Sequence, residues 1–130
     1  MQQGETAAGG RRAAAPAAFD SGAVLNALTD PVFVVDDGAR FAALNAAAEQ
    51  FFASSAPALV GRAVTDVVDA DSPLHALIRQ AHDHGGTVSQ YGVTIESARV
   101  GTRHVSIDAS AIPEMPGCVA VVLQERAIAR

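Results

Sequence analysis

The final third of the chain alternates apolar and polar side chains with a period of two, and this pattern constrains the fold most strongly. Tyr91, Val93 and Ile95 alternate with polar residues, and the segment 105–111 repeats the pattern. Such alternation is typical of a β-strand with one buried and one solvated face. The segment 118–123 is apolar throughout, which predicts a strand that is covered on both faces.

The first part of the chain predicts a short helix and a β-hairpin. A helix at 21–28 precedes the apolar segment 32–35, which we expect to be a strand. Asp37-Gly38 suits the tight turn of a hairpin, and 40–44 returns as a second strand. If the strand at 32–35 lies beside the strand at 118–123, the centre of the sheet is apolar on both faces.

The middle of the chain predicts helices with clear starting signals. Asn45 is a suitable N-cap for a helix at 46–53, and Ser72-Pro73 combines a capping hydroxyl with proline at the first helical position. From Leu74 onward, apolar residues recur at i, i+3, i+4 and i+7 until Gly85-Gly86. The whole order predicts an α+β domain: a five-stranded antiparallel sheet with short helices on one face and an N-terminal helix on the other.

Composition argues against several classes of function. The net charge is −5, all nine basic residues are arginine, and they form no basic stripe, so we expect neither nucleic-acid nor membrane-surface binding. The single cysteine, Cys118, excludes an internal disulfide and fits a reducing cytoplasm. The longest apolar segments are far below the ~20 residues that span a membrane. We therefore expect a cytoplasmic protein.

Several local sequences resemble a PAS domain. Residues 30–36, Asp-Pro-Val-Phe-Val-Val-Asp, are similar to its first strand, and Asn45 opens the next helix. Phe51-Phe52 lies within that helix, and Gly61-Arg62 follows the next turn. The resemblance covers about 20–126 and implies the PAS fold.

A narrower resemblance is to the N-terminal sensor domain of NtrB, the histidine kinase family of nitrogen regulation. The motifs that carry it lie at 71–74, 96–101 and 123–129. In that family the chain continues into a dimerisation helix with the phospho-accepting histidine and an ATP-binding domain, and a PII-type protein controls the kinase. The resemblance implies a two-component regulatory module that catalyses nothing itself and passes a signal to the downstream kinase core.

These observations divide the chain into three parts. The segment 1–18 is rich in glycine and alanine and predicts a disordered tail. The domain is expected at 19–126, and 127–130 is expected to begin a linker toward a kinase dimerisation helix that this chain lacks.

Two sets of residues are predicted to carry the regulatory role. An apolar outer sheet face needs a cover, and a second copy of the domain would supply it as a homodimer. The residues expected at that interface are Val24, Leu25, Leu28, Val32, Val34 and Val119. Gln124, Glu125 and Arg126 are the candidate signal-coupling segment, because the covered strand leaves the domain there; a frayed, charged terminus is the alternative.

The competing hypothesis is a small-molecule or haem sensor. A pocket between sheet and long helix would be lined by Phe33, Phe51, Leu77, Ile78, Tyr91, Val93, Ile107 and Val121. These side chains offer almost no charge to orient a polar metabolite, so a filled core is favoured. Haem-binding PAS domains use a histidine on the long helix, but His75 and His82 are expected at the edge of its apolar stripe. We expect no cofactor, no metal site and no catalytic residues.

Overall fold

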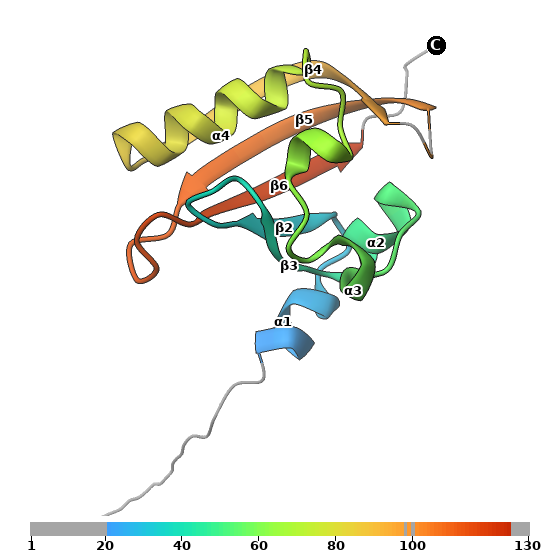
Figure 1. Ribbon diagram of the computed structural model, residues 1–130, viewed down its shortest axis with the longest axis horizontal. Helices are drawn as coiled ribbons and strands as arrows, with labels where there is room; N and C mark the ends of the chain where they lie inside the picture. The colour runs from blue at the N-terminus through green and yellow to red at the C-terminus, as the bar shows by residue number, and fades with distance from the viewer. Residues whose placement is uncertain (1–20, 98, 100, 126–130) are drawn as a thin grey trace, which may run out of the picture.

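The computed structural model describes residues 21–97, 99 and 101–125, and five of its segments are strands of one antiparallel sheet. The elements are α1 (Ser21–Ala27), β2 (Val32–Val35), β3 (Phe41–Leu44), α2 (Ala46–Phe52), α3 (Ala56–Leu59), η1 (Val64–Asp66), α4 (Pro73–His84), β4 (Thr87–Ser97), β5 (Gly101–Ala111) and β6 (Val119–Glu125). The strand order is β3-β2-β6-β5-β4. Helix α4 packs across β4, β5 and β6, and the shorter helices gather near β2 and β3 (Figure 1). The predicted α+β sheet with short helices is confirmed.

The strands that come first and last along the chain, β2 and β6, pair with each other at the centre of the sheet. Val32 lies opposite Val122, and Val35 lies opposite Val119. Because the pairing is antiparallel, the start of β2 lies beside the end of β6, where the Leu123 amide donates to the Pro31 carbonyl at 2.9 Å. The predicted contact between these two apolar strands is confirmed, and it places the entry of the chain into the sheet beside its exit.

A single apolar cluster fills the space between the sheet and the helices. Four phenylalanines at its centre contact one another in tilted and edge-to-face pairs, with ring centroids 5.1 to 5.6 Å apart, the geometry that aromatic pairs favour. The cluster includes seven of the residues predicted to line a pocket or core: Phe33, Phe51, Leu77, Ile78, Val93, Ile107 and Val121.

Tyr91 was predicted in that lining, and this prediction is wrong. Its side chain is 73% exposed, whereas Val93 is buried. The cause is a β-bulge: the β4–β5 register shifts between Gln90 and Val93, and Gly92 adopts a φ of 67° there. One extra residue reverses the alternation of a strand, so Tyr91 turns away from the core.

Val119 was predicted at the outer interface, and this prediction is also wrong. Its side chain is 1% exposed and belongs to the core cluster, together with Val121 and Leu123. Alternation along β6 therefore places Ala120 and Val122 on the outer face. Because every residue of this segment is apolar, the sequence does not show which side chains face inward. The predicted outer-face residue is therefore wrong by one position along the strand.

Helix α1 is tied to the start of α2. The side-chain oxygen of Asn26 accepts a hydrogen bond from the Ala46 amide at 2.8 Å, and α1 contacts α2. Val24 and Leu28 remain about half exposed, at 50% and 49%. That α1 covers the outer sheet face stays a prediction. The side chain of Leu25 lies outside the described residues, as do the segments 1–18 and 126–130.

Asn45 is a fully buried polar residue that joins three segments. Its Oδ1 accepts from the amides of Val32 at 3.0 Å and Ala48 at 2.9 Å, and its Nδ2 donates to the Asp30 carbonyl at 3.0 Å. The predicted N-cap of α2 is confirmed. The same side chain also fixes the segment that leads into β2, so it positions the entry of the sheet.

Replacing this amide tests its structural role. Asn45→Ala should lower the free energy of unfolding by about 2–4 kcal/mol, because it removes a cap and leaves buried amides without an acceptor. Gln50→Ala, an exposed position in the same helix, should stay within about 0.5 kcal/mol. Urea unfolding followed by circular dichroism measures both. Equal effects of the two substitutions would contradict this role.

Candidate functional site

The end of β6 is held by an arginine fork from β5. Arg103 donates from Nε to Glu125 Oε2 at 2.6 Å and from its second terminal nitrogen to Oε1 at 2.8 Å. This two-point geometry is the one in which guanidinium and carboxylate match best. The hydrogen bond to Arg103 lowers the pKa of Glu125 and raises the pKa of Arg103. Both side chains are partly solvated, so the pair contributes at most about 1 kcal/mol to stability.

Arg103 also contacts the aromatic core. Its guanidinium carbon lies 4.9 Å from the centre of the Phe51 ring, within the range of a cation–π contact. Phe51 is buried in α2 and packs on Phe52 with ring centroids 5.1 Å apart. The guanidinium of Arg103 therefore contacts both the aromatic core, at Phe51, and Glu125, the last residue of β6.

A second contact joins the exit of the sheet to its entry. Gln124 Nε2 lies 3.5 Å from Asp30 Oδ2, at the outer limit of a hydrogen bond. Asp30 in turn is the residue whose carbonyl accepts from Asn45. The structure thus brings Gln124 and Glu125 of the predicted coupling segment to one site, while Arg126 lies outside the described residues.

Sequence reasoning missed Arg103 and Asp30 as members of this site. Val105 pairs with Glu125 across β5 and β6, and Arg103 is two residues from Val105 on the same side of the strand. Diagonal neighbours of this kind are within reach of long side chains. The register between β5 and β6 decides which arginine lies near Glu125, and the sequence does not reveal it. Opposite charge alone does not select Arg103 among several arginines.

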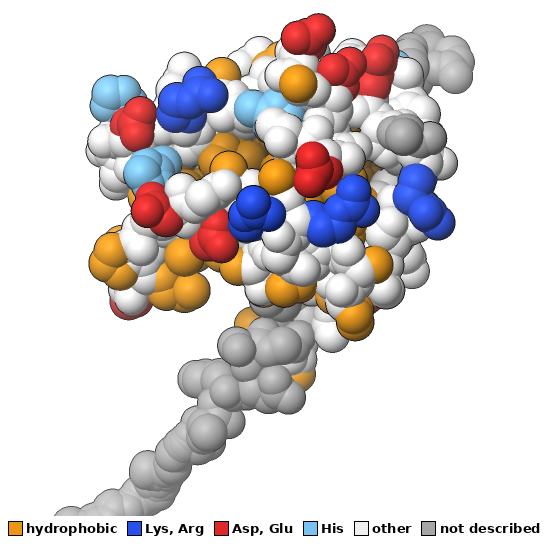
Figure 2. Space-filling model, viewed as in Figure 1, with side chains coloured by type: hydrophobic (Ala, Val, Ile, Leu, Met, Phe, Trp, Pro, Cys, Tyr) orange, Lys and Arg blue, Asp and Glu red, His pale blue; other side chains and the backbone are white. Residues whose placement is uncertain are grey.

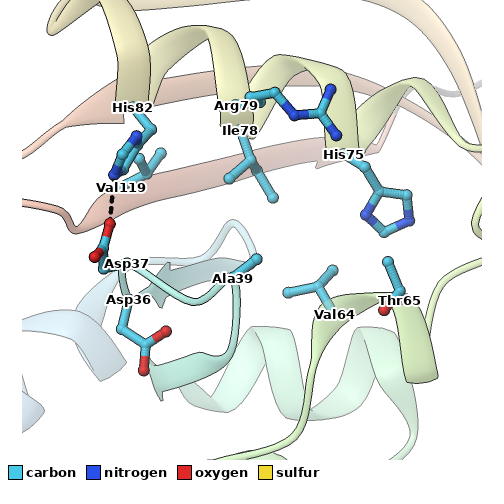
Figure 3. Close-up of a pocket in the computed structure, with 10 residues that line it drawn as sticks. All are labelled: Asp36, Asp37, Ala39, Val64, Thr65, His75, Ile78, Arg79, His82 and Val119. Carbon is cyan, nitrogen blue, oxygen red and sulfur yellow. Dashed lines mark hydrogen bonds and ion pairs between the residues drawn. The ribbon is translucent and has the colours of Figure 1, made fainter.

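A groove between α4 and the β2–β3 turn is the second candidate site (Figure 3). Its volume is about 210 Å³, and its apolar floor includes Val64, Ile78 and Val119. Charged side chains from both walls surround this floor, and the apolar surface is visible between them in Figure 2. The volume is below the range of about 300–1,000 Å³ typical of small-molecule sites. Only Ile78 of the predicted pocket lining contributes to it.

The two histidines considered for haem lie at the rim of this groove. His75 Nε2 is 2.9 Å from the Asp69 carbonyl oxygen, and His82 Nε2 is 2.7 Å from Asp37 Oδ1. In each of these two histidines, Nε2 is therefore bonded to one of the protein's own oxygens. Within the described residues, no group of three or more histidine, cysteine, aspartate or glutamate side chains is placed to hold a metal ion.

Comparison with known proteins decides the family. The model of the PAS fold matches residues 22–126. The chain belongs to the PAS fold family. Among curated relatives, it is 35% identical over 112 residues to the sensory histidine kinase/phosphatase NtrB of Azospirillum brasilense, and 36% identical over 108 residues to NtrB of Rhizobium meliloti. These matches cover 86% and 82% of this chain, which spans 28% of the length of each relative.

Solved structures support the same fold. The PAS domain of nitrogen regulation protein NR(II) from Vibrio parahaemolyticus superposes with a TM-score of 0.73 at 22% identity, covering 84% of this chain and 100% of that one. A domain of a sensory box histidine kinase/response regulator from Geobacter sulfurreducens gives 0.64 at 14% identity, covering 79% and 89%. In the described part of this PAS domain, no helix is long and apolar enough to cross a membrane.

The arginine fork predicts a pH-dependent contribution to the PAS domain's stability. The folded-state pKa of Glu125 is lowered, so its contribution is present above the unfolded value and is lost as pH falls through the folded value. Arg103→Lys removes the two-point bond and should raise the Glu125 pKa toward its ordinary value, at a cost of at most about 1 kcal/mol. Carboxyl-detected NMR titration measures this pKa. An unchanged Glu125 titration in Arg103→Lys would show that the fork does not act in solution.

Proposed function

We propose that this PAS domain is the regulatory module of an NtrB-like two-component histidine kinase and passes a signal to the kinase core through the end of β6. The observation that carries the proposal is the Arg103–Glu125 fork, which fixes the exit strand to the aromatic core. Similarity to NtrB proteins over most of this chain supports an NtrB-like kinase as the parent, the full-length protein to which the domain belongs. Kinase chemistry is assigned to the rest of the parent and not to this chain.

Three polar contacts at one end of the sheet support the proposed transmission of a signal. The fork holds Glu125 to β5, and Gln124 reaches Asp30 at the entry. The Leu123 amide bonds the Pro31 carbonyl. Because entry and exit are bonded to each other, a shift at either end displaces the other. Such a shift is the input that a downstream helix would receive.

We also propose that the module forms a homodimer through its outer sheet face. Val34, Ala120 and Val122 alternate with buried residues along β2 and β6, and each is only partly covered. Val24 of α1 and Leu28, which follows α1, are half exposed. Val32 is already covered in the single copy, at 6% exposure, so it adds little. A contiguous apolar surface of this kind on a small domain favours self-association.

The parent defines the remaining partners. We infer a cytoplasmic module joined to the downstream kinase core, in a parent that a PII-type regulator controls. A single, partly buried cysteine fits that location. The apolar cluster that occupies the space between sheet and α4 favours this role over the small-molecule or haem sensor.

Charge reversal in the intact parent kinase tests the coupling. Glu125→Arg should change the autophosphorylation rate severalfold while the domain remains folded, because it places two guanidinium groups side by side and releases the exit strand. Adding Arg103→Glu restores the pair with reversed charges and should return part of the rate. Radiolabelled phosphate incorporation measures the rate, and circular dichroism checks folding.

The matched control is Glu114→Arg in the β5–β6 connection, an exposed position that has the same charge change. Its autophosphorylation should stay at the wild-type rate. Equal autophosphorylation rates for wild type and Glu125→Arg would contradict the proposed coupling.

The dimer has its own test on the isolated domain. Ala120→Lys places a charge on the outer face, where a single copy tolerates it but a dry interface does not. Sedimentation equilibrium at ~100 μM should show a dimer for wild type and a monomer for Ala120→Lys, since interfaces of modest size dissociate at lower concentrations. Gln80→Lys, exposed on α4, should remain dimeric. A monomeric wild type at this concentration would contradict the dimer.

A further inference from the structure

His82 lies between two carboxylates at the end of α4. Its Nε2 is 2.7 Å from Asp37 Oδ1, and its Nδ1 is 3.1 Å from Asp83 Oδ1. An ionised carboxylate only accepts hydrogen bonds, and a neutral imidazole has a single N–H to donate. Both contacts are therefore satisfied together only by the doubly protonated ring. The geometry itself indicates a cationic His82.

The contact with Asp37 joins parts of the fold that are far apart in sequence. Asp37 belongs to the β2–β3 turn, and His82 to the last turn of α4. The side chain of Asp37 also lies close to Gly117, where an added Cβ would come within 3.2 Å of the Asp37 Cβ. Figure 3 shows the His82–Asp37 bond crossing one end of the groove between helix and turn. Helix, turn and the β5–β6 connection therefore meet at this pair.

We propose that His82 is a proton-operated latch: protonated, it ties the end of α4 to the β2–β3 turn, and on losing its proton it releases this tie. The neutral ring keeps at most one of its two bonds, and that bond loses its charge assistance. Freed of the latch, the turn moves independently of α4 and the groove opens at that end. The domain thereby acquires a conformation that depends on pH, independently of the signalling role proposed above.

Other groups near His82 favour its charged form on balance. From the β2–β3 turn, Asp36 and Asp37 both line the groove, although Asp36 Oδ1 already accepts from the amides of Gly38 and Arg40. From β6 and η1 the lining residues are uncharged.

Few groups on α4 or in the β5–β6 connection oppose a positive charge on His82. Asp83 contacts the ring, Arg79 lines the same groove, and His75 lies two turns earlier on the rim. Cys118, from the β5–β6 connection, lines the adjoining hollow. His82 also sits at the C-terminal end of the helix, where the helix dipole favours a cation.

The direction of the pH effect follows from these contacts. Hydrogen bonds to Asp83 and Asp37 raise the pKa of His82 above its ordinary value of 6.5. A raised folded-state pKa means that the latch is fully present below the unfolded value and is lost as pH rises through the folded value. Acidification therefore closes the latch, and mild alkalinisation opens it.

Histidine-detected NMR titration of the whole chain tests the latch. His82 should titrate above the ordinary histidine value, because both neighbouring carboxylates stabilise the protonated ring. The amides of Gly38 and Ala39 in the turn should shift with the same midpoint as His82. Asp37→Asn should abolish that response of the turn, whereas Asp83→Asn should lower the midpoint and keep the response.

His82→Gln provides the second variant, because it keeps a polar side chain but cannot titrate. Its turn amides should show no transition near the His82 midpoint, while the remaining spectrum stays that of the folded domain. The proposal is overturned if His82 titrates at or below the ordinary histidine value, or if the turn amides keep the same transition in His82→Gln or Asp37→Asn.

Discussion

The antiparallel pairing of β2 with β6 is the constraint on which the rest of the structure depends. It joins the first strand of the sheet to the last, so the fold cannot form until residues about 90 apart in sequence have met. It also makes the centre of the sheet apolar on both faces: one face packs on the core, and the other carries the partly covered side chains of Val34, Ala120 and Val122. The same pairing sets the chain's entry beside its exit, where the Pro31 carbonyl accepts from the Leu123 amide.

Polar side chains then fix each end of that pair. Asn45 organises the entry through bonds to the backbone on both sides of Pro31. Arg103 organises the exit by holding Glu125 while resting on the Phe51 ring. Together Asn45 and Arg103 make one end of the sheet a single bonded unit, which the proposed transmission of a displacement to a downstream domain requires.

The local signals predicted most of the fold because they act within a few residues. The caps at Asn45 and Ser72-Pro73 and the glycine at 85 mark helix ends in the structure as expected. The alternating pattern could not show which residues face the core on each side of a bulge. The bulge at Gly92 turned Tyr91 outward. The site depends on register across strands, so the sequence predicted Gln124 and Glu125 but not Arg103, which bonds Glu125 from the neighbouring strand.

Native-state hydrogen exchange of the isolated domain tests the central claim, that the exit of β6 is part of the cooperative core. The amides of Leu123, Val121 and Phe33 should exchange through one opening, with free energies that agree within about 1 kcal/mol. Exchange of Leu123 through local fraying, several kcal/mol below the other two, would contradict the account. The end of β6 would then be a loose terminus that cannot pass a displacement onward.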